Sequence, residues 1–378
     1  MRIIIHELVK VISTPALIGF ILICLALNIM LAVSGRDRYT DYIADVSQTT
    51  GYVMGPEFDE RVSNLPAGEH AAILRMHTNG MTDVFDGYTT GYIAEAYIAR
   101  LELTGAVADL MREKYAKLQY AADEKLQSGE GMTLYFAGAT YYRHTQLFRV
   151  IMGVLLAQGM LLSALIMLLS LGYEFSAKTE LVVYFTKKGR RLNHSKLIAS
   201  IAASFLLYGV IVGVTLAVYL ILNPFGGTWG SSVSSGFNFV TDLLAGARPF
   251  ITWRSFSIGG YLAASVGLTF TLSLCFALMA YIAGLGTRNS YIGFIVVALV
   301  NFANVAIPPG QVFGVSLPTF IFSHSPIWLA IQQGWWFTDG GSNYLWPHFE
   351  VITIVGSLTL LTALSFFSWR QFRRRNLS

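Results

Sequence analysis

Six stretches of almost uncharged, apolar sequence constrain what this chain can fold into. They cover residues 12–33, 150–172, 197–222, 258–285, 291–307 and 349–367. Most reach the roughly 20 apolar residues that an α-helix needs to cross the ~30 Å hydrocarbon core of a bilayer. Helices of this kind satisfy their own backbone groups in lipid. The sequence therefore predicts an all-α membrane protein with six transmembrane helices.

Composition and the placement of charge support this prediction. With 54% hydrophobic and 13% charged residues, the chain is too apolar for a soluble enzyme. Residues 1–11, 173–196, 286–290 and 368–378 hold thirteen lysines and arginines but only three acids. By the positive-inside rule, these segments and both termini are expected in the cytoplasm. Residues 1–11 are apolar on one side, which predicts a short interfacial helix, and residues 368–378 form a basic tail.

The segment 34–149 is the one sizeable water-soluble region and is expected outside the cell. Its residues 34–143 contain ten basic and sixteen acidic side chains. Apolar residues recur at helical spacing over 93–126, which predicts an amphipathic helix about 50 Å long. Gly105 is a candidate break, and Gly129 and Gly131 mark its end. We expect a largely helical extracellular domain without disulfides, because the two cysteines, Cys24 and Cys275, fall inside apolar runs.

Two further segments are expected outside. Residues 223–257 form a loop rich in glycine and serine. Residues 308–348 are apolar but interrupted by prolines, and they contain four tryptophans. Such a segment is typical of short re-entrant or interfacial helices with tryptophans at headgroup level.

The sequence lacks the residue patterns that are typical of common enzyme active sites. No phosphate-binding loop occurs, so an ATPase site is not expected in this chain. His6-Glu7 begins like a zinc-protease motif, but Lys10 stands where the second histidine should be. The predicted spans have no internal Asp, Glu, Lys or Arg, and Glu350 in the first turn of the last one is expected to be interfacial. We therefore expect no catalytic residues, metal, cofactor or nucleic-acid partner.

The loop 173–196 between the second and third spans carries the most distinctive charges. Contact with anionic lipid accounts for its basic cluster. It does not account for Glu174 and Glu180, which are set among those basic residues.

Here the chain resembles the six-span permease subunit of ABC exporters of the type-2 membrane-component family. That family has Glu-Leu-x-Lys in its N-terminal helix ahead of a proline, as Glu7, Leu8, Lys10 and Pro15 do here. Its second span ends in an acidic residue, which is followed by a short helix, a basic turn and a lysine that opens the third span. The residues that fit this order are Glu174, Thr179, Thr186, Lys187, Gly189, Arg190 and Lys196. Lys178 departs from the pattern, because the family usually has glycine there, and the outer domain exceeds the minimal family plan.

The resemblance implies partners and roles. Two copies of a separate ATPase subunit, which would bind ATP and Mg²⁺, dock beneath two permease subunits, identical or homologous. Segment 173–196 would be the coupling helix that contacts the ATPase, with Glu174 and Glu180 pairing with its basic residues. The coupling residues implied are Glu174, Lys178, Thr179, Glu180, Lys187, Lys188, Gly189, Arg190 and Arg191. Glu7 and Lys10 would lie in the interfacial helix, and Asn301 and Asn304 would hydrogen-bond either across the dimer or within one subunit.

Two functions of different classes follow. In the first, the chain is the permease of an ATP-driven exporter in a bacterial plasma membrane, moving a hydrophobic or amphiphilic lipid, peptide or antibiotic outward. In the second, it is a membrane receptor or scaffold whose outer domain binds a ligand without ATP. Co-purification with an ATPase subunit separates the two.

Overall fold

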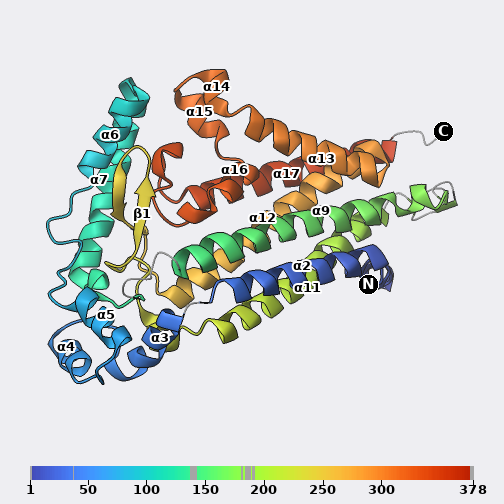
Figure 1. Ribbon diagram of the computed structural model, residues 1–378. Helices are drawn as coiled ribbons and strands as arrows, with labels where there is room; N and C mark the ends of the chain where they lie inside the picture. Colours follow the sequence, from blue (N-terminus) through green and yellow to red (C-terminus); the bar gives the residue numbers. More distant parts are fainter. Residues whose placement is uncertain are drawn as a thin grey trace.

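Helices make up most of the chain in the computed structural model, which describes residues 2–36, 38–136, 143–179, 182–183, 189 and 192–374. Figure 1 shows a long helical bundle with a domain of shorter helices, α3 to α7, at one end. Both ends of the chain lie at the opposite end of the bundle, which we call the termini end (Figure 1).

Five helices of the described chain are long and apolar enough to cross a membrane. They are α2 (Pro15–Ser34), α9 (Met152–Ser176) with its π-helical first turns η2 (Thr145–Ile151), α11 (Leu192–Leu222), α12 (Ile258–Thr287) and α17 (Phe349–Arg374). The architecture is that of a mainly helical, multi-pass membrane protein.

The predicted fifth span corresponds to a shorter helix. α13 (Ser290–Ala306) is apolar and 17 residues long, about 25 Å at 1.5 Å per residue. It begins at Asn289, whose side-chain oxygen accepts hydrogen bonds from the backbone N–H groups of Tyr291 and Ile292 at 2.9 and 3.1 Å. Pro308 and Pro309 follow its last turn. A sixth crossing stays a prediction.

Helices α9 and α12 form the centre of the bundle. Over the most apolar 18 residues of each helix, 67% of the residues are buried in α9 and 56% in α12. The corresponding values are 17% in α17 and 22% in α2. α11 and α13 pack against α9, α17 packs against α12, and α2 packs against α11 together with α1 (Arg2–Ile12). The outer faces of α2 and α17 keep their large apolar side chains exposed, as lipid contact requires. Cys24 and Cys275 are free and buried, as expected.

Several helices run past the predicted spans. α9 continues to Ser176, α11 begins at Leu192, and α17 extends through Arg374 across most of the predicted basic tail. The apolar pattern marks the part of a helix that suits lipid, whereas the backbone hydrogen bonds continue for further turns into polar sequence.

The domain at the far end contains α3 (Arg38–Thr50), α4 (Pro56–Ser63), α5 (Glu69–Thr78), α6 (Gly91–Leu101) and α7 (Gly105–Ser128). The segment 93–126 forms two helices instead of one continuous helix, and the break ends at the candidate position, Gly105. Glu102 and Gly105 have φ values of 53° and 55°, so the chain turns between α6 and α7. The two helices then pack together, with the rings of Tyr97 and Tyr115 5.7 Å apart. Gly129, at φ 66°, ends α7 as expected.

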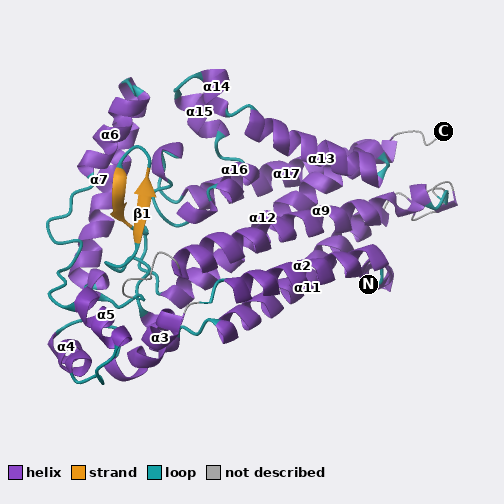
Figure 2. Ribbon diagram, in the orientation of Figure 1, coloured by secondary structure: helices purple, strands orange, loops and turns teal. Residues whose placement is uncertain are grey.

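A two-stranded antiparallel hairpin departs from the all-α prediction (Figure 2). Strands β1 (Phe239–Asp242) and β2 (Gly246–Pro249) pair Phe239 with Pro249 and Asp242 with Gly246. Asp242 accepts hydrogen bonds from the backbone N–H groups of Leu244 and Ala245, and Gly246 adopts φ 83°. This is the usual chemistry of a three-residue hairpin loop. Four-residue strands are too short to give a clear alternating pattern in the sequence.

The remaining connections contain short helical turns. The segment 308–348 holds α14 (Pro309–Phe313), α15 (Leu317–Phe322), α16 (Pro326–Ile331), η5 (Gln333–Trp335) and η6 (Gly341–Asn343). η1 (Glu130–Met132) follows α7, and η4 (Gly226–Gly230) follows α11. Short helices were expected in 308–348 and are present there. Their position within the membrane stays a prediction.

Candidate functional site

Four charged residues from three helices meet at the termini end of the bundle. We call Glu7, Lys10, Glu174 and Lys196 the ion cluster. The Lys196 ammonium contacts one carboxylate oxygen of Glu174, and Lys10 lies 3.4 Å from the other. Lys10 is also 3.4 Å from Glu7, one turn earlier in α1. The cluster therefore joins α1, the last turns of α9 and the first turns of α11.

The ion cluster is buried and its charges balance. The exposed fraction of the side chain is 0% for Lys196, 5% for Glu174, 7% for Glu7 and 20% for Lys10. Lys196 also donates to the backbone carbonyl of Ser170 at 2.5 Å, and Lys10 lies 3.5 Å above the ring of Tyr173. Two lysines and two glutamates satisfy one another, as buried ions require. Glu174 thus faces lysines of its own chain.

The chain leaves α9 through a tight C-terminal turn. The backbone N–H of Thr179 donates to the carbonyl of Glu174 at 2.9 Å, and that of Lys178 donates to the carbonyl of Phe175 at 3.3 Å. Lys178 lies between them at φ 54°. This pair of bonds around one left-handed residue is the Schellman motif, whose left-handed position normally holds glycine. The left-handed position therefore accounts for the glycine that is usual there, and Lys178 adopts the same conformation with the penalty of a Cβ.

Of the remaining predicted coupling residues, one is described by the structure and the others are not. Gly189 is described and buried. Glu180, Lys187, Lys188, Arg190 and Arg191, together with Thr186 of the family pattern, lie outside the described residues.

The two asparagines of α13 make contacts within the chain. The Asn301 amide donates to the carbonyl of Val297 at 2.8 Å, and its nitrogen lies 3.8 Å from the sulfur of Met279 in α12. The Asn304 side-chain oxygen accepts from the hydroxyl of Ser325, just before α16, at 3.4 Å. These contacts match the within-subunit alternative.

A polar triad inside the bundle was missed by the sequence analysis. Asn28 of α2 and Gln158 of α9 exchange two amide hydrogen bonds of 2.9 and 2.8 Å, and Asn28 also donates to Thr215 of α11 at 2.8 Å. All three side chains are buried. Asn301 and Asn304 were the amides singled out in the predicted spans, whereas Asn28 and Gln158 were not. Such bonds hold membrane helices in register.

A second buried charge network joins the α3–α7 domain to the bundle. Arg248 of β2 contacts both carboxylate oxygens of Asp339 at 3.0 and 2.8 Å. Lys114 of α7 donates to the carbonyls of Asp339, Gly341 and Tyr344 at 3.2, 2.7 and 2.8 Å. Burial opposes ionisation of Asp339, but Arg248 and Lys114 outweigh it and hold its pKa below the usual range. Burial lowers the pKa of Lys114 to about 8. The residues come from distant parts of the sequence, so no local pattern announces them.

His144 and Glu350 are also buried. His144, one residue before η2, is surrounded by Phe148, Phe250 and Tyr261, with ring centroids 4.9 to 6.0 Å away. Burial, assisted by the charge of Arg149, lowers the pKa of His144 to about 3, so its ring is neutral. Glu350 was expected at the interface but is 2% exposed, and its carboxylate accepts a hydrogen bond from the backbone N–H of Phe337.

No family model, curated protein or solved structure matches the chain. Within the described residues, no group of three or more His, Cys, Asp or Glu is arranged to hold a metal ion. The family resemblance therefore rests on the residues quoted for it and on where they lie.

Proposed function

We propose that this chain is the membrane-spanning permease subunit of an ATP-driven ABC exporter. One observation carries the proposal. The resemblance was drawn from three separate motifs: Glu7 and Lys10 in the N-terminal helix, Glu174 at the end of the second span, and Lys196 at the start of the third. These residues lie 164 and 22 positions apart in the chain, yet their side chains meet in one buried ion cluster. Residues that share a structural task are expected to meet in this way.

The ion cluster suggests how force would pass through such a subunit. It holds α1 against the helix ends that flank the loop 173–196, which the resemblance identifies as the coupling helix. A push on that loop would move α9, α11 and α1 together, because separating them exposes buried charges. We propose that Glu174 positions the coupling helix from within the subunit. The earlier interpretation, a direct ion pair with the ATPase, fits less well because Glu174 is 5% exposed.

The proposal has further parts that follow from the resemblance and the charge pattern. α13, the predicted fifth span, would also cross the membrane and bring the number of crossings to six. The termini end would face the cytoplasm of a bacterial cell. Two permease subunits would pair, with two ATPase subunits below that bind ATP and Mg²⁺. The substrate would be hydrophobic or amphiphilic and would move outward, in keeping with the uncharged interiors of the predicted spans.

A pull-down from the native membrane tests the proposal. The full chain, tagged at its C-terminus, is extracted in mild detergent, and its partners are identified by mass. A stoichiometric Walker-motif ATPase is the expected result. If the chain is recovered alone or with a partner that is not an ATPase, the permease proposal fails and the receptor or scaffold function replaces it.

A second measurement tests the role of the ion cluster. ATP hydrolysis by the purified complex is compared for the wild type, Glu174→Gln and Glu113→Gln. Glu113 lies on the exposed surface of α7, far along the chain, and serves as a matched control. Complexes that assemble with Glu174→Gln should lose substrate-stimulated hydrolysis, whereas Glu113→Gln should keep it. Full stimulation with Glu174→Gln would contradict the positioning role.

A further inference from the structure

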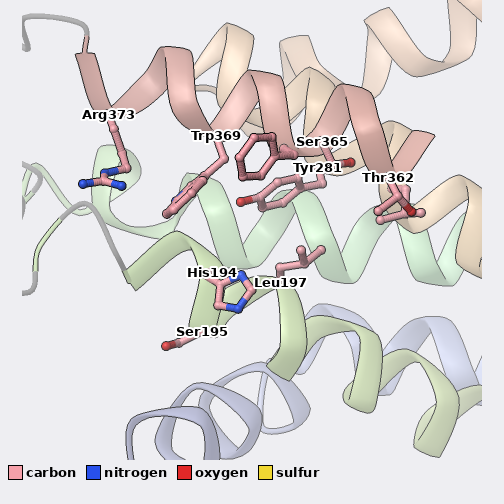
Figure 3. Close-up of a pocket in the computed structure, with 10 residues that line it drawn as sticks. His194, Ser195, Leu197, Tyr281, Thr362, Ser365, Trp369 and Arg373 are labelled. Atoms are coloured by element: carbon pink, nitrogen blue, oxygen red, sulfur yellow. The ribbon is translucent and has the colours of Figure 1, made fainter. Parts of the chain in front are cut away.

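An open groove runs along α17 at the termini end of the bundle (Figure 3). Its floor is α12, with Leu278 and Tyr281, and its two walls are α11 and α17. The cavity measures about 650 Å³, within the range of about 300 to 1,000 Å³ that is usual for ligand sites. The groove is separate from the ion cluster, whose residues do not line it.

The groove has the length of one leaflet. Its lining on α17 extends from Thr362 to Arg373, which is eleven residues or about 16 Å along a helix. Half of a ~30 Å hydrocarbon core is about 15 Å. A lipid of one leaflet that lies beside α17 would therefore match the groove in length.

The polarity of the residues that line the groove changes along its length. Apolar side chains of Leu197, Leu278 and Phe366 line its walls and floor. Toward the C-terminal end of α17, Arg373 lies 4.9 Å above the ring of Trp369, and this ring is 6.3 Å from that of His194 (Figure 3). A basic and aromatic end next to an apolar channel matches a lipid headgroup next to its acyl chain.

Two buried polar atoms in the lining point to oxygen atoms in the ligand. Within the described chain, the Ser365 hydroxyl and the Trp369 indole nitrogen have no hydrogen-bond partner. Ser365 is 5% exposed. Both groups are donors, and a buried donor left unpaired is destabilising. The ester and phosphate oxygens of a phospholipid are acceptors that would satisfy them once the side chains of the lining shift to expose the two donors.

The charge near the groove selects an anion. Among the described residues that line the groove, Arg373 carries a positive charge and none is acidic. We propose that the groove binds one anionic phospholipid, with an acyl chain between α11 and α17 and the phosphate near Arg373 and Trp369. This site does not depend on ATP-driven transport, so it can hold even if the proposed function fails.

Lipid retention by the purified full-length protein tests the site. The protein in mild detergent is titrated with phosphatidylglycerol or with phosphatidylcholine of the same acyl chains, and bound lipid is counted by native mass spectrometry. We expect one phosphatidylglycerol to bind more tightly than phosphatidylcholine. Arg373→Gln should weaken phosphatidylglycerol binding about fivefold, which corresponds to about 1 kcal/mol for one cation near a lipid headgroup.

A second pair of variants tests the channel itself. Thr362→Phe places a ring in the apolar half of the groove and should abolish retention of the tight lipid. Arg370→Gln and Thr359→Phe are matched controls, because both positions are exposed on α17 and neither lines the groove. Wild-type binding is expected for both controls, and a monodisperse elution profile confirms that each variant is folded.

Three results would overturn the proposal. One is equal retention of the two lipids, and another is a phosphatidylglycerol count that none of the groove variants changes. The third is competition by inorganic phosphate at concentrations similar to those of the lipid, since that result would identify an anion site that does not recognise the acyl chain.

Discussion

Replacing Glu174 with glutamine should destabilise the protein by far more than replacing its neighbour Lys10. Glu174→Gln keeps the size of the side chain but leaves the Lys196 ammonium, with 0% exposure, beside a carbonyl and an amide. Removing one partner of a buried pair costs about 3 to 5 kcal/mol. Lys10 is 20% exposed and makes two contacts of 3.4 Å, so Lys10→Gln should cost less, about 1 to 2 kcal/mol, chiefly because Glu7 is left without the described cation.

A double variant separates lost contacts from an uncompensated charge. Glu174→Gln with Lys196→Met removes both members of the innermost pair and leaves no buried ion without a partner. We expect it to be about 1 to 2 kcal/mol more stable than Glu174→Gln alone, because apolar replacement of a buried pair is often close to neutral. The variants are compared by reversible SDS titration from mild detergent micelles, followed by far-ultraviolet circular dichroism.

The reasoning has a clear point of failure. If the double variant is no more stable than Glu174→Gln, then Lys196 does not depend on Glu174 for its charge. Equal effects of Glu174→Gln and Lys10→Gln would likewise show that burial does not control the energy of the ion cluster.

Four further outcomes follow from other parts of the molecule. Lys178→Gly should stabilise the protein by about 1 kcal/mol, because glycine adopts φ 54° without a Cβ penalty, whereas the control Lys178→Ala should not. In the unfolded chain His144 takes up a proton below its ordinary pKa of about 6.5, whereas in the folded chain it does so only near pH 3. The free energy of unfolding should therefore fall by about 2 kcal/mol from pH 8 to pH 5. His144→Phe should reduce this loss. Arg248→Met should destabilise the protein by about 3 kcal/mol or more and speed limited proteolysis of the α3–α7 domain, while the exposed control Arg112→Met should not. Gly226 has φ 51°, and a Cβ there would lie 1.8 Å from the Ala44 carbonyl oxygen. Gly226→Ala should therefore destabilise the protein by about 2 kcal/mol or more in the same titration. The control Gly91→Ala meets no atom within 4 Å and should be neutral or slightly stabilising.

Long apolar runs made most of the bundle predictable. A run such as 258–285 has one stable solution in lipid, a helix, and α12 has that form over Ile258–Thr287. The glycine that ends α7 was also readable, because Gly129 lies where the helical pattern stops. The break was readable only in part: Gly105 marked a candidate position, but the apolar spacing of α6 continues in α7, and nothing in the sequence indicates that Glu102 also adopts a left-handed conformation.

Contacts between distant segments were beyond prediction. Lys114 and Asp339 are 225 positions apart, and nothing near either residue indicates the other. The ion cluster was partly accessible, because its members had been noticed as motif residues, but their burial and mutual pairing had not. The Asn28–Gln158 pair was visible in principle, because two amides in apolar runs need partners inside the membrane.

The bonds around Lys114 limit how this protein can be taken apart. Its ammonium reaches three carbonyls in the segment that leads into α17, while Asp339 of that segment binds Arg248. Excising the α3–α7 domain would therefore leave these buried carbonyls, in the segment before α17, without their donor. The α3–α7 domain cannot be exchanged for another domain or expressed alone without losing these contacts. A chimera must include the hairpin and the segment before α17 together with the domain.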